Sequence, residues 1–494
     1  MGQDIDQIRF TREDRQRYRD KVKRNLAVLK HLIDTGAFEV ERKLVGVEVE
    51  FYVVDGDGAP MMINAELLSR IESEDFQTEL AQYNIEFNLA PHKIVGTVLR
   101  EIEEELETSF LHAHRRAQDL DAHVVMIGIL PTLSDLHVTI QNLSANPRYH
   151  LLNEQILEAR GEDLQVIIEG EETLDLNASS ITMESAATSV QLHLQVSPAR
   201  FGRVWNAAQA ISAAQVAVGA NSPFLLGKQL WRETRIALFE QTIDTRSEEL
   251  AAQGVRPRVW FGERWIDSVG DLFDENVRYF PALLPLLDQE EPEALLRGGG
   301  VPHLPELTLH NGTIWRWNRP IYAVARGKPH LRVENRVLPA GPSCVDIVAN
   351  AAFYYGLVRG LMDLDEPIEQ QLSFAAAADN FRTAAHDGID ARLFWPGVGI
   401  VPASELVLRT LLPLAHEGLD AWGVDRRDRD HYLGIIEQRA LRRVTGATWQ
   451  IRTFRMLRER DGLDRREALV EMTRRYMTGM RANEPVHTWP LPQG

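Results

Sequence analysis

Apolar positions in the first hundred residues change from a helical spacing to a strand spacing. Thr11 is a candidate helix cap and Gly36 a candidate helix end. Between them, apolar side chains recur mostly every three or four residues, at Val22, Leu26, Leu29, Leu32 and Ile33. This spacing predicts an amphipathic helix over 11–36 that packs on the outside of the fold. The segment 44–55 is rich in β-branched residues and is followed by a glycine-rich turn, so it predicts a strand.

Similar patterns alternate up to about residue 365. Strands are predicted over 83–89, 123–129, 189–197 and 331–338, and helices over 97–121, 200–218 and 343–362. From residue 366 onward the pattern is that of helices rich in Ala, Leu, Arg and Glu. We therefore expect an α+β fold with a mixed region over 1–365 and a helical C-terminal region over 366–494 packed on it. The segment 289–305, which contains three consecutive glycines, is the best candidate for a mobile connection.

Each predicted strand divides into an apolar face and a polar face, because successive side chains of a strand point to opposite sides. In 44–55 the polar face carries Glu48 and Glu50. In the strands over 83–89, 189–197 and 331–338 it carries Asn84, Glu86 and Asn88; Gln191, His193 and Gln195; and Arg332, Glu334 and Arg336. Antiparallel sheets often expose one polar face to solvent, so one such strand alone indicates no function. The coincidence in four strands indicates a shared polar site.

The carboxylates on these faces predict a cation site. Neighbouring glutamates on one strand face repel each other unless a cation lies between them. Carboxylate oxygens and one imidazole suit Mg²⁺ or Mn²⁺ ions that also hold phosphate oxygens. The predicted ligands are Glu48, Glu50, Glu86, His193 and Glu334. Arg332 and Arg336 could offset the charge that develops on a transferred phosphoryl group.

Composition excludes several classes of function. The chain has 494 residues, 44% apolar and 26% charged, which are values of an ordinary globular protein. Its formal charge of -18, from 72 acidic and 54 basic residues, argues against non-specific binding to nucleic acid or to an anionic membrane. We expect no secretory signal and no membrane-spanning helix, because no apolar run approaches ~18 residues. The single cysteine, Cys344, favours the reducing cytoplasm.

Several short segments resemble, in this order, the sequence blocks of the glutamate-cysteine ligase superfamily. They are GVEVEF (46–51), EFNLAP (86–91), SVQLHLQV (189–196), ANSPFLLG (220–227), HNGTIWRWNRP (310–320) and RVENRVLPAGPS (332–343). The resemblance implies a fold of the glutamine synthetase type, in which helices flank a curved, largely antiparallel sheet with ATP and metal on its concave face. It makes 1–365 the catalytic region. The C-terminal helices match none of these blocks, so the resemblance does not specify the acceptor amine.

The resemblance also implies roles for single residues. The five predicted cation ligands keep that role, with Glu50 counted among the catalytic residues together with Arg332 and Arg336. Arg336 resembles the arginine that contacts the transferred phosphate, and Gln191 is expected to position nucleotide or metal. Four further arginines are expected near the glutamate carboxylate or the phosphate: Arg316, Arg319, Arg232 and Arg235. Trp315 and Trp317 are expected either to line the pocket or to lie in the core.

The reaction implied by the resemblance is an ATP-dependent ligation. Metal-bound ATP phosphorylates the γ-carboxylate of glutamate, and an amine attacks the acyl phosphate to form an amide. The expected partners are the small molecules ATP, glutamate and an amine, with cysteine the first candidate, and a homo-oligomer is compatible with the sequence. Three alternatives stay open: a ligase for another amine, a catalytically silent relative that binds glutamate or nucleotide, and a metal-dependent hydrolase that uses the same carboxylates.

Overall fold

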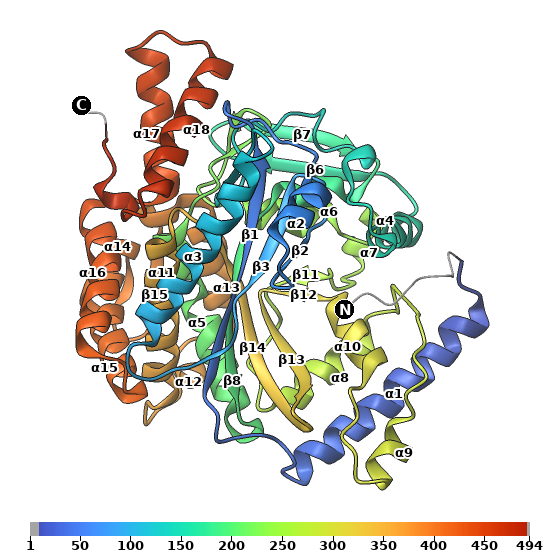
Figure 1. The fold of residues 1–494 in the computed structure, drawn as a ribbon. Coiled ribbons are helices and arrows are strands. Elements are labelled where there is room, and N and C mark those ends of the chain that lie inside the picture. The colour runs from blue at the N-terminus through green and yellow to red at the C-terminus, as the bar shows by residue number, and fades with distance from the viewer. Residues whose placement is uncertain (1–8, 492–494) are drawn as a thin grey trace.

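A strongly curled antiparallel sheet of eight strands lies at the centre of the computed structural model, which describes residues 9–491 (Figure 1). Along the sheet the strands are β13 (Asn318–Ala325), β14 (Lys328–Pro339), β8 (Ser189–Val196), β1 (Leu44–Val54), β3 (Asn84–Asn88) and β2 (Phe76–Thr78). Two short strands, β4 (His92–Lys93) and β5 (His123–Val125), also pair with β1. The long strand β1 therefore has hydrogen-bonded neighbours along both edges.

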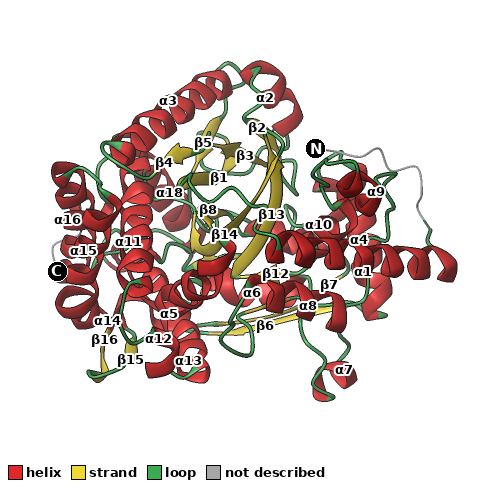
Figure 2. Ribbon diagram, turned by 90° about the horizontal axis from the view of Figure 1, so that it is seen from below, coloured by secondary structure: helices red, strands yellow, loops and turns green. Residues whose placement is uncertain are grey.

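Three helices cover one face of the sheet: α3 (Val98–Gln118), α5 (Phe201–Gly219) and α11 (Cys344–Met362) (Figure 2). The alternate valines of β1, Val45, Val47 and Val49, are at most 1% exposed and belong to the main hydrophobic core. From α11, the Tyr355 hydroxyl donates to the Gly46 carbonyl at 3.2 Å. The face that carries Glu48 and Glu50 is therefore the concave one.

The sequence predicted most of this sheet. The strands expected over 44–55, 83–89, 189–197 and 331–338 are β1, β3, β8 and β14, and the α+β fold with a curved antiparallel sheet is confirmed. The strand expected over 123–129 was too long, because β5 ends at Val125. Beyond it the Met126 carbonyl accepts a hydrogen bond from the Tyr476 hydroxyl at 2.8 Å instead of from a neighbouring strand.

The C-terminal region is helical, as expected, apart from one hairpin. Its helices are α12 (Ile368–Gln371), α13 (Phe374–Asp387), α14 (Ala403–Leu406), α15 (Leu412–Trp422), α16 (Arg426–Arg442), α17 (Gly446–Glu459) and α18 (Arg465–Arg481). The hairpin of β15 (Arg392–Trp395) and β16 (Gly399–Pro402) was not predicted. Helix α13 packs on α5 and α15 packs on α11, so these helices extend the layer behind the sheet.

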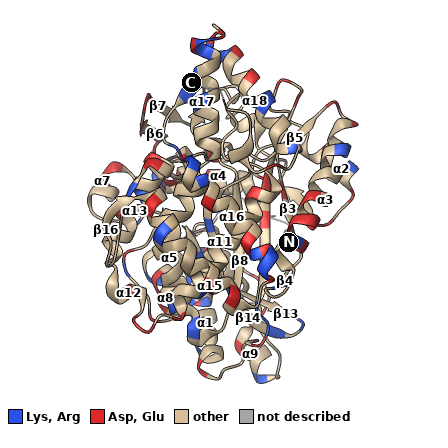
Figure 3. Ribbon diagram, turned by 90° about the vertical axis from the view of Figure 1, so that its left-hand side faces the viewer, with Lys and Arg blue, Asp and Glu red and all other residues tan. Residues whose placement is uncertain are grey.

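The projecting pair α17 and α18 is joined to the rest of the fold partly by ion pairs. Arg465 lies 2.9 Å from Glu172, and Arg474 lies 2.5 Å from Asp57. Acidic and basic positions are interspersed over this side of the molecule (Figure 3).

Within residues 9–491, no helix is both long enough and apolar enough to cross a membrane.

The remaining helices and strands lie between residues 64 and 316 of the chain. The helices are α2 (Asn64–Ile71), α4 (Pro147–Arg160), α6 (Thr234–Thr242), α7 (Glu248–Ala252), α8 (Val269–Tyr279), α9 (Pro292–Arg297) and α10 (Pro305–Gly312). The strands are β6 (Leu164–Glu169), β7 (Thr173–Ala178), β9 (Phe224–Leu225), β10 (Lys228–Gln229), β11 (Val259–Trp260) and β12 (Trp315–Arg316). A 3-10 turn, Ile181–Ala186, precedes β8.

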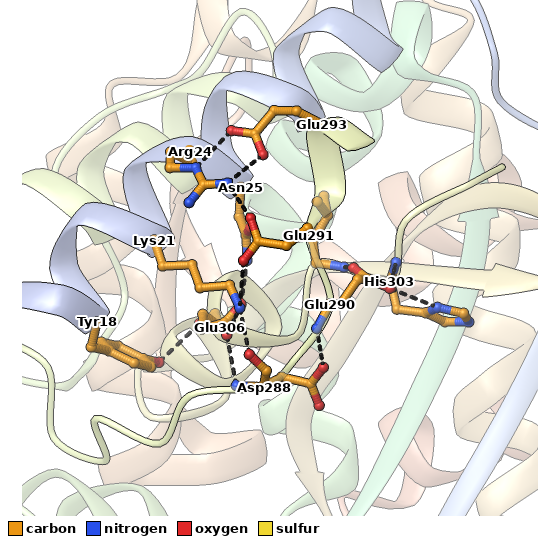
Figure 4. A network of polar contacts seen from close by, with 11 residues as sticks. Tyr18, Lys21, Arg24, Asn25, Asp288, Glu290, Glu291, Glu293, His303 and Glu306 are labelled. Atoms are coloured by element: carbon orange, nitrogen blue, oxygen red, sulfur yellow. Dashed lines mark hydrogen bonds and ion pairs between the residues drawn. The ribbon is translucent and has the colours of Figure 1, made fainter. Parts of the chain in front are cut away.

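Helix α1 (Arg12–Asp34) lies on the outside of the fold, as predicted, and packs on α8, α9 and α10 (Figure 1). Figure 4 shows the polar contacts that hold it there. Lys21 lies 3.1 Å from the buried Glu306 of α10, and Asn25 donates to the same carboxylate at 2.8 Å. Arg24 contacts Glu291 at 2.5 Å and Glu293 at 2.7 Å. The segment 289–305, expected as a mobile connection, thus contains α9 and is bound to α1 by ion pairs.

Candidate active site

Polar side chains of four strands meet on the concave face. Across the ladders, Glu48 stands opposite Gln191 on one side and Asn88 on the other. Glu50 stands opposite Glu86, and Glu334 of β14 stands opposite His193 of β8. The alternation of side chains along the sequence therefore places these residues side by side, because antiparallel strands in register share their faces.

Two cavities lie on this face, and Glu48 lines both. The first, which we call the carboxylate cavity, has a volume of about 330 Å³ and is lined by Glu48, Glu50, Glu79, Glu86 and Glu184, among others. The second, which we call the basic cavity, has a volume of about 380 Å³. Its lining combines apolar residues such as Val47, Leu89 and Pro91 with Arg42, Arg326, Lys328 and Arg332.

A first group of possible cation ligands lies between the two cavities. Ligand atoms of Glu48, His193 and Glu334 all lie within 4.8 Å of one another. The His193 Nε2 atom is 2.8 Å from Glu48, and its Nδ1 accepts a hydrogen bond from Arg332 Nε at 3.0 Å. Burial alone would raise the pKa of Glu334, but Arg319 and Arg336 outweigh it and hold the pKa well below its usual range. This carboxylate is therefore ionised.

A second group lies deeper in the carboxylate cavity and has a different electrostatic character. Ligand atoms of Glu50, Glu79 and Glu86 also lie within 4.8 Å of one another. Burial raises the pKa of Glu86 to about 8, with further contributions from Glu48 and Glu50, and burial also raises those of Glu79 and Glu50. Within residues 9–491, no Lys or Arg forms an ion pair with Glu79 or Glu86. A divalent cation would supply the missing positive charge.

Arg336 and Gln191 join these two groups. Gln191 donates to Glu50 at 3.2 Å and accepts a hydrogen bond from Arg336, which also lies 3.4 Å from Glu334. Glu50 in addition accepts from the Ser189 backbone N–H at 2.7 Å. The guanidinium of Arg336 therefore faces the carboxylates of both groups from the centre of the concave face.

Three of the predicted substrate-binding arginines do not line either cavity. Arg316 is 1% exposed and donates to Glu275 of α8 at 3.0 Å, where it also stacks on Trp260. Arg232 lies 3.7 Å from Asp390 of the C-terminal region. Arg235 is buried and donates to backbone carbonyls of β14. Arg319, by contrast, lines the carboxylate cavity, and Arg332 lines the basic cavity.

Sequence reasoning missed several residues that line the carboxylate cavity. Glu79 follows the three-residue strand β2, and Glu184 lies in the 3-10 turn before β8, where burial and then Glu50 raise its pKa to about 8. Arg148 of α4 is exposed at the cavity and forms no ion pair with any residue in the described part of the chain. None of the three belongs to a strand with alternating faces, so the pattern could not find them. Trp315 lines the cavity, whereas Trp317 is buried in the core.

Comparisons with known proteins identify a family and a similar fold. The model of glutamate-cysteine ligase family 2 (GCS2) matches residues 44–466. A comparison with curated proteins gave no match. Among solved structures, the chain is similar to a glutamate-cysteine ligase from Francisella tularensis in complex with AMP, with a TM-score of 0.55 and 13% identity over 91% of each chain.

Two further structures resemble the chain more weakly. A bifunctional glutathione synthetase from Pasteurella multocida has a TM-score of 0.47 and 13% identity, over 93% of this chain and 55% of that one. The complex between the prokaryotic ubiquitin-like protein Pup and its ligase PafA has a TM-score of 0.40 and 10% identity, over 89% of this chain and 72% of that one.

Proposed function

The chain belongs to glutamate-cysteine ligase family 2, and from this premise we propose that it is an ATP- and magnesium-dependent ligase that joins the γ-carboxylate of glutamate to an amine. Cysteine is the first candidate for the amine. The observation that carries the proposal is the pair of carboxylate groups on one concave face, with Arg336 and Gln191 between them. Such a face can hold a polyphosphate through cations while it presents an arginine to the phosphoryl group that is transferred.

The donor set fits Mg²⁺. Glu50, Glu79 and Glu86 offer hard oxygen atoms within 4.8 Å of one another, and their raised pKa values indicate that positive charge is lacking there. Glu48, His193 and Glu334 would hold a second ion. When bound, Mg²⁺ would offset the charge of the phosphate oxygens.

The side chains of the protein would align the reactants. Arg336 would stabilise negative charge on the transferred phosphoryl group, and Gln191 fixes the direction of its guanidinium. Arg319, which also faces Glu334, would contribute a second positive charge at the same place. An acyl phosphate of glutamate would then be held against the concave face of the sheet until the amine attacks its carbonyl carbon and phosphate leaves.

The two cavities suit different reactants. We assign ATP to the basic cavity, because its apolar walls suit a base and its arginine and lysine side chains suit phosphate oxygens. We assign glutamate to the carboxylate cavity. There Arg148 suits an α-carboxylate, and Glu184 suits an ammonium group. The γ-phosphate and the γ-carboxylate would then meet near Glu48, which both cavities share.

Phosphate release is the direct test of this proposal. The purified protein is incubated with Mg²⁺, ATP and L-glutamate, with and without each member of a panel of amines that includes L-cysteine. Release that requires both glutamate and cysteine supports a glutamate-cysteine ligase. Release with another amine keeps the mechanism and changes the acceptor.

Two controls separate the alternatives. Glu48→Ala and Glu334→Ala should abolish turnover while the circular dichroism spectrum stays that of the wild type, and near-normal activity in either variant contradicts the metal assignment. Binding of Mg²⁺ and ATP without release under any condition favours the silent relative. Product formation without ATP consumption favours a hydrolase.

A further inference from the structure

The ladder between β14 and β8 contains a β-bulge directly beside the active-site arginine. Asn335 pairs with Leu192, and the next pair is Leu338 with Val190, so β14 has one residue more than its partner over this stretch. The additional residue falls at Arg336 or Val337. Bulges bend a strand and change the direction of the side chains at that point. This bulge therefore influences where the Arg336 guanidinium points.

A bulge also leaves backbone groups without partners in the ladder, and here a single buried side chain binds two of them. Arg235 Nη1 donates to the Arg336 carbonyl at 3.4 Å, and Arg235 Nη2 donates to the Val337 carbonyl at 2.6 Å. The Arg336 backbone N–H donates to the Trp317 carbonyl at 2.8 Å. The bulge is therefore held through both its carbonyls and its amide.

Arg235 is itself rigidly placed. Its Nε donates to Glu233 at 3.1 Å, and Glu233 is fully buried and also accepts from the Asn221 backbone N–H at 2.8 Å. The Arg235 guanidinium lies 5.6 Å from the centre of the Trp317 ring. Its planar fork is suited to binding two adjacent carbonyls, whereas the ammonium group of a lysine is a point charge.

From these contacts we infer that Arg235 is a positioning residue, which directs the Arg336 guanidinium toward Gln191 and Glu334 by fixing the β-bulge of β14. Arg235 lines neither cavity, so this role replaces the substrate-binding role expected from the sequence. The inference rests on the proposed function, because it assigns Arg336 to the transferred phosphoryl group. It predicts that Arg235 acts on turnover only through Arg336.

A double-mutant cycle tests this prediction. Displacement of a reacting group by about 1 Å can cost roughly 100-fold in rate. Arg235→Lys should therefore lower kcat by roughly 100-fold in the wild-type background but by less than about threefold in the Arg336→Lys background. Equal losses in both backgrounds would overturn the inference, because a residue with a merely structural role reduces turnover whichever residue stands at 336.

Arg439 provides a matched control. It is also a buried arginine paired with a buried acid, Asp346 at 2.6 Å, and it donates to the Val218 and Asp346 carbonyls, but it lies between α16 and α11 away from both cavities. Arg439→Lys should lower the Tm while kcat at low temperature stays within about twofold of the wild type. A loss of kcat as large as that of Arg235→Lys would contradict a specific role for Arg235.

Two further arrangements keep the test decisive. If Arg235→Lys does not fold, Glu233→Gln, which weakens the hold on Arg235, takes its place in the same cycle. If the wild type releases no phosphate with any amine, the proposed function fails, and the cycle is measured on the Kd for ATP with Mg²⁺. A smaller loss of ATP affinity from Arg235→Lys in the Arg336→Lys background than in the wild type then still supports the inference. Equal losses of affinity in the two backgrounds overturn it.

Discussion

Arg319 binds both carboxylate oxygens of Glu334: its Nε lies 2.6 Å from Oε2 and its Nη2 lies 3.0 Å from Oε1. This bidentate pair is among the strongest charged contacts that side chains form. It occupies the same oxygens that would bind a cation together with Glu48 and His193. A cation and the Arg319 guanidinium therefore compete for Glu334.

Removal of Arg319 should separate cation binding from turnover. We expect Arg319→Gln to bind Mn²⁺ more tightly, by about three- to tenfold, because Glu334 then has only Arg336 as a cationic neighbour, and to turn over more slowly, because a charge near the phosphoryl group is lost. Electron paramagnetic resonance of free Mn²⁺ measures the first effect and phosphate release the second. Weaker Mn²⁺ binding in this variant would show that the two positive charges do not compete.

Glu79 should be required for the cation in the deeper group. We expect Glu79→Gln to leave the Tm of the metal-free protein unchanged or higher, because one of several crowded carboxyls is neutralised, and to reduce the rise in Tm that Mg²⁺ produces. Differential scanning fluorimetry with a chelator and with Mg²⁺ measures both. Glu74→Gln is the control, since Glu74 is exposed in the same segment. The same rise in Tm in both variants would remove Glu79 from the ligand set.

Glu86 and Glu184 should each contribute a loss of stability to the metal-free protein as the pH rises from about 4.5 to about 8. Burial raises the pKa of Glu86 to about 8 and that of Glu184 to about 8, from an ordinary value of 4.5. A carboxyl that is harder to ionise in the folded state contributes its stabilisation below the unfolded pKa and loses it as the pH rises through the folded pKa. Mg²⁺ should counteract this loss, because it binds the ionised carboxylates.

Thermal unfolding across this pH range, with a chelator or with Mg²⁺, measures the effect. Glu86→Gln should flatten the pH dependence of the metal-free protein. The same pH dependence of the Tm in the metal-free wild type and in Glu86→Gln would contradict the raised pKa of Glu86.

The assignment of glutamate to the carboxylate cavity makes a kinetic prediction. We expect Arg148→Gln and Glu184→Gln each to raise the KM for glutamate by about tenfold or more, while the KM for ATP changes little. The first variant loses the positive charge that the α-carboxylate would meet, and the second loses the carboxyl that would ionise beside the ammonium group. Arg466→Gln is the control, because Arg466 is exposed on α18. If only the KM for the amine increased, this part of the cavity would bind the acceptor amine and not glutamate.

The contact between α1 and α10 should contribute strongly to stability. Lys21→Met leaves the buried Glu306 without its cationic partner, although Asn25 and the Asp288 backbone N–H still donate to it. We expect a loss of about 3 kcal/mol in the free energy of unfolding. Lys30→Met removes an exposed pair with Asp274 on the same helix and should cost at most about 1 kcal/mol. Urea denaturation compares the two, and equal losses would contradict a specific role for the buried pair.

The shared face of the candidate active-site residues could be predicted from the sequence for a simple physical reason. The period of two in a strand is a local property, so Glu48, Glu50, Gln191, His193 and Glu334 could be assigned to one face without knowledge of the fold. The same rule, applied further, separates Arg316 from Arg319: residues three apart in an extended chain point to opposite sides. Arg319 indeed faces the cavity, and Arg316 faces α8.

What could not be predicted depends on contacts between distant segments. Glu79 and Glu184 reach the cavity from irregular backbone, where no period relates sequence to direction. The bulge at Arg336 exists only in the pairing of β14 with β8, and the contact of Arg235 with it joins residues about a hundred positions apart. The hairpin of β15 and β16 is a short exception within a helical pattern.

Glu48 lines both cavities, and this has a thermodynamic consequence. Two ligands that share one wall cannot bind independently if each changes the charge or position of that wall. Linkage then requires that the factor by which the first ligand changes the affinity for the second equals the factor by which the second changes the affinity for the first. A neutral residue at position 48 would therefore change this coupling factor equally in both directions, and measuring it with one ligand would determine it for the other.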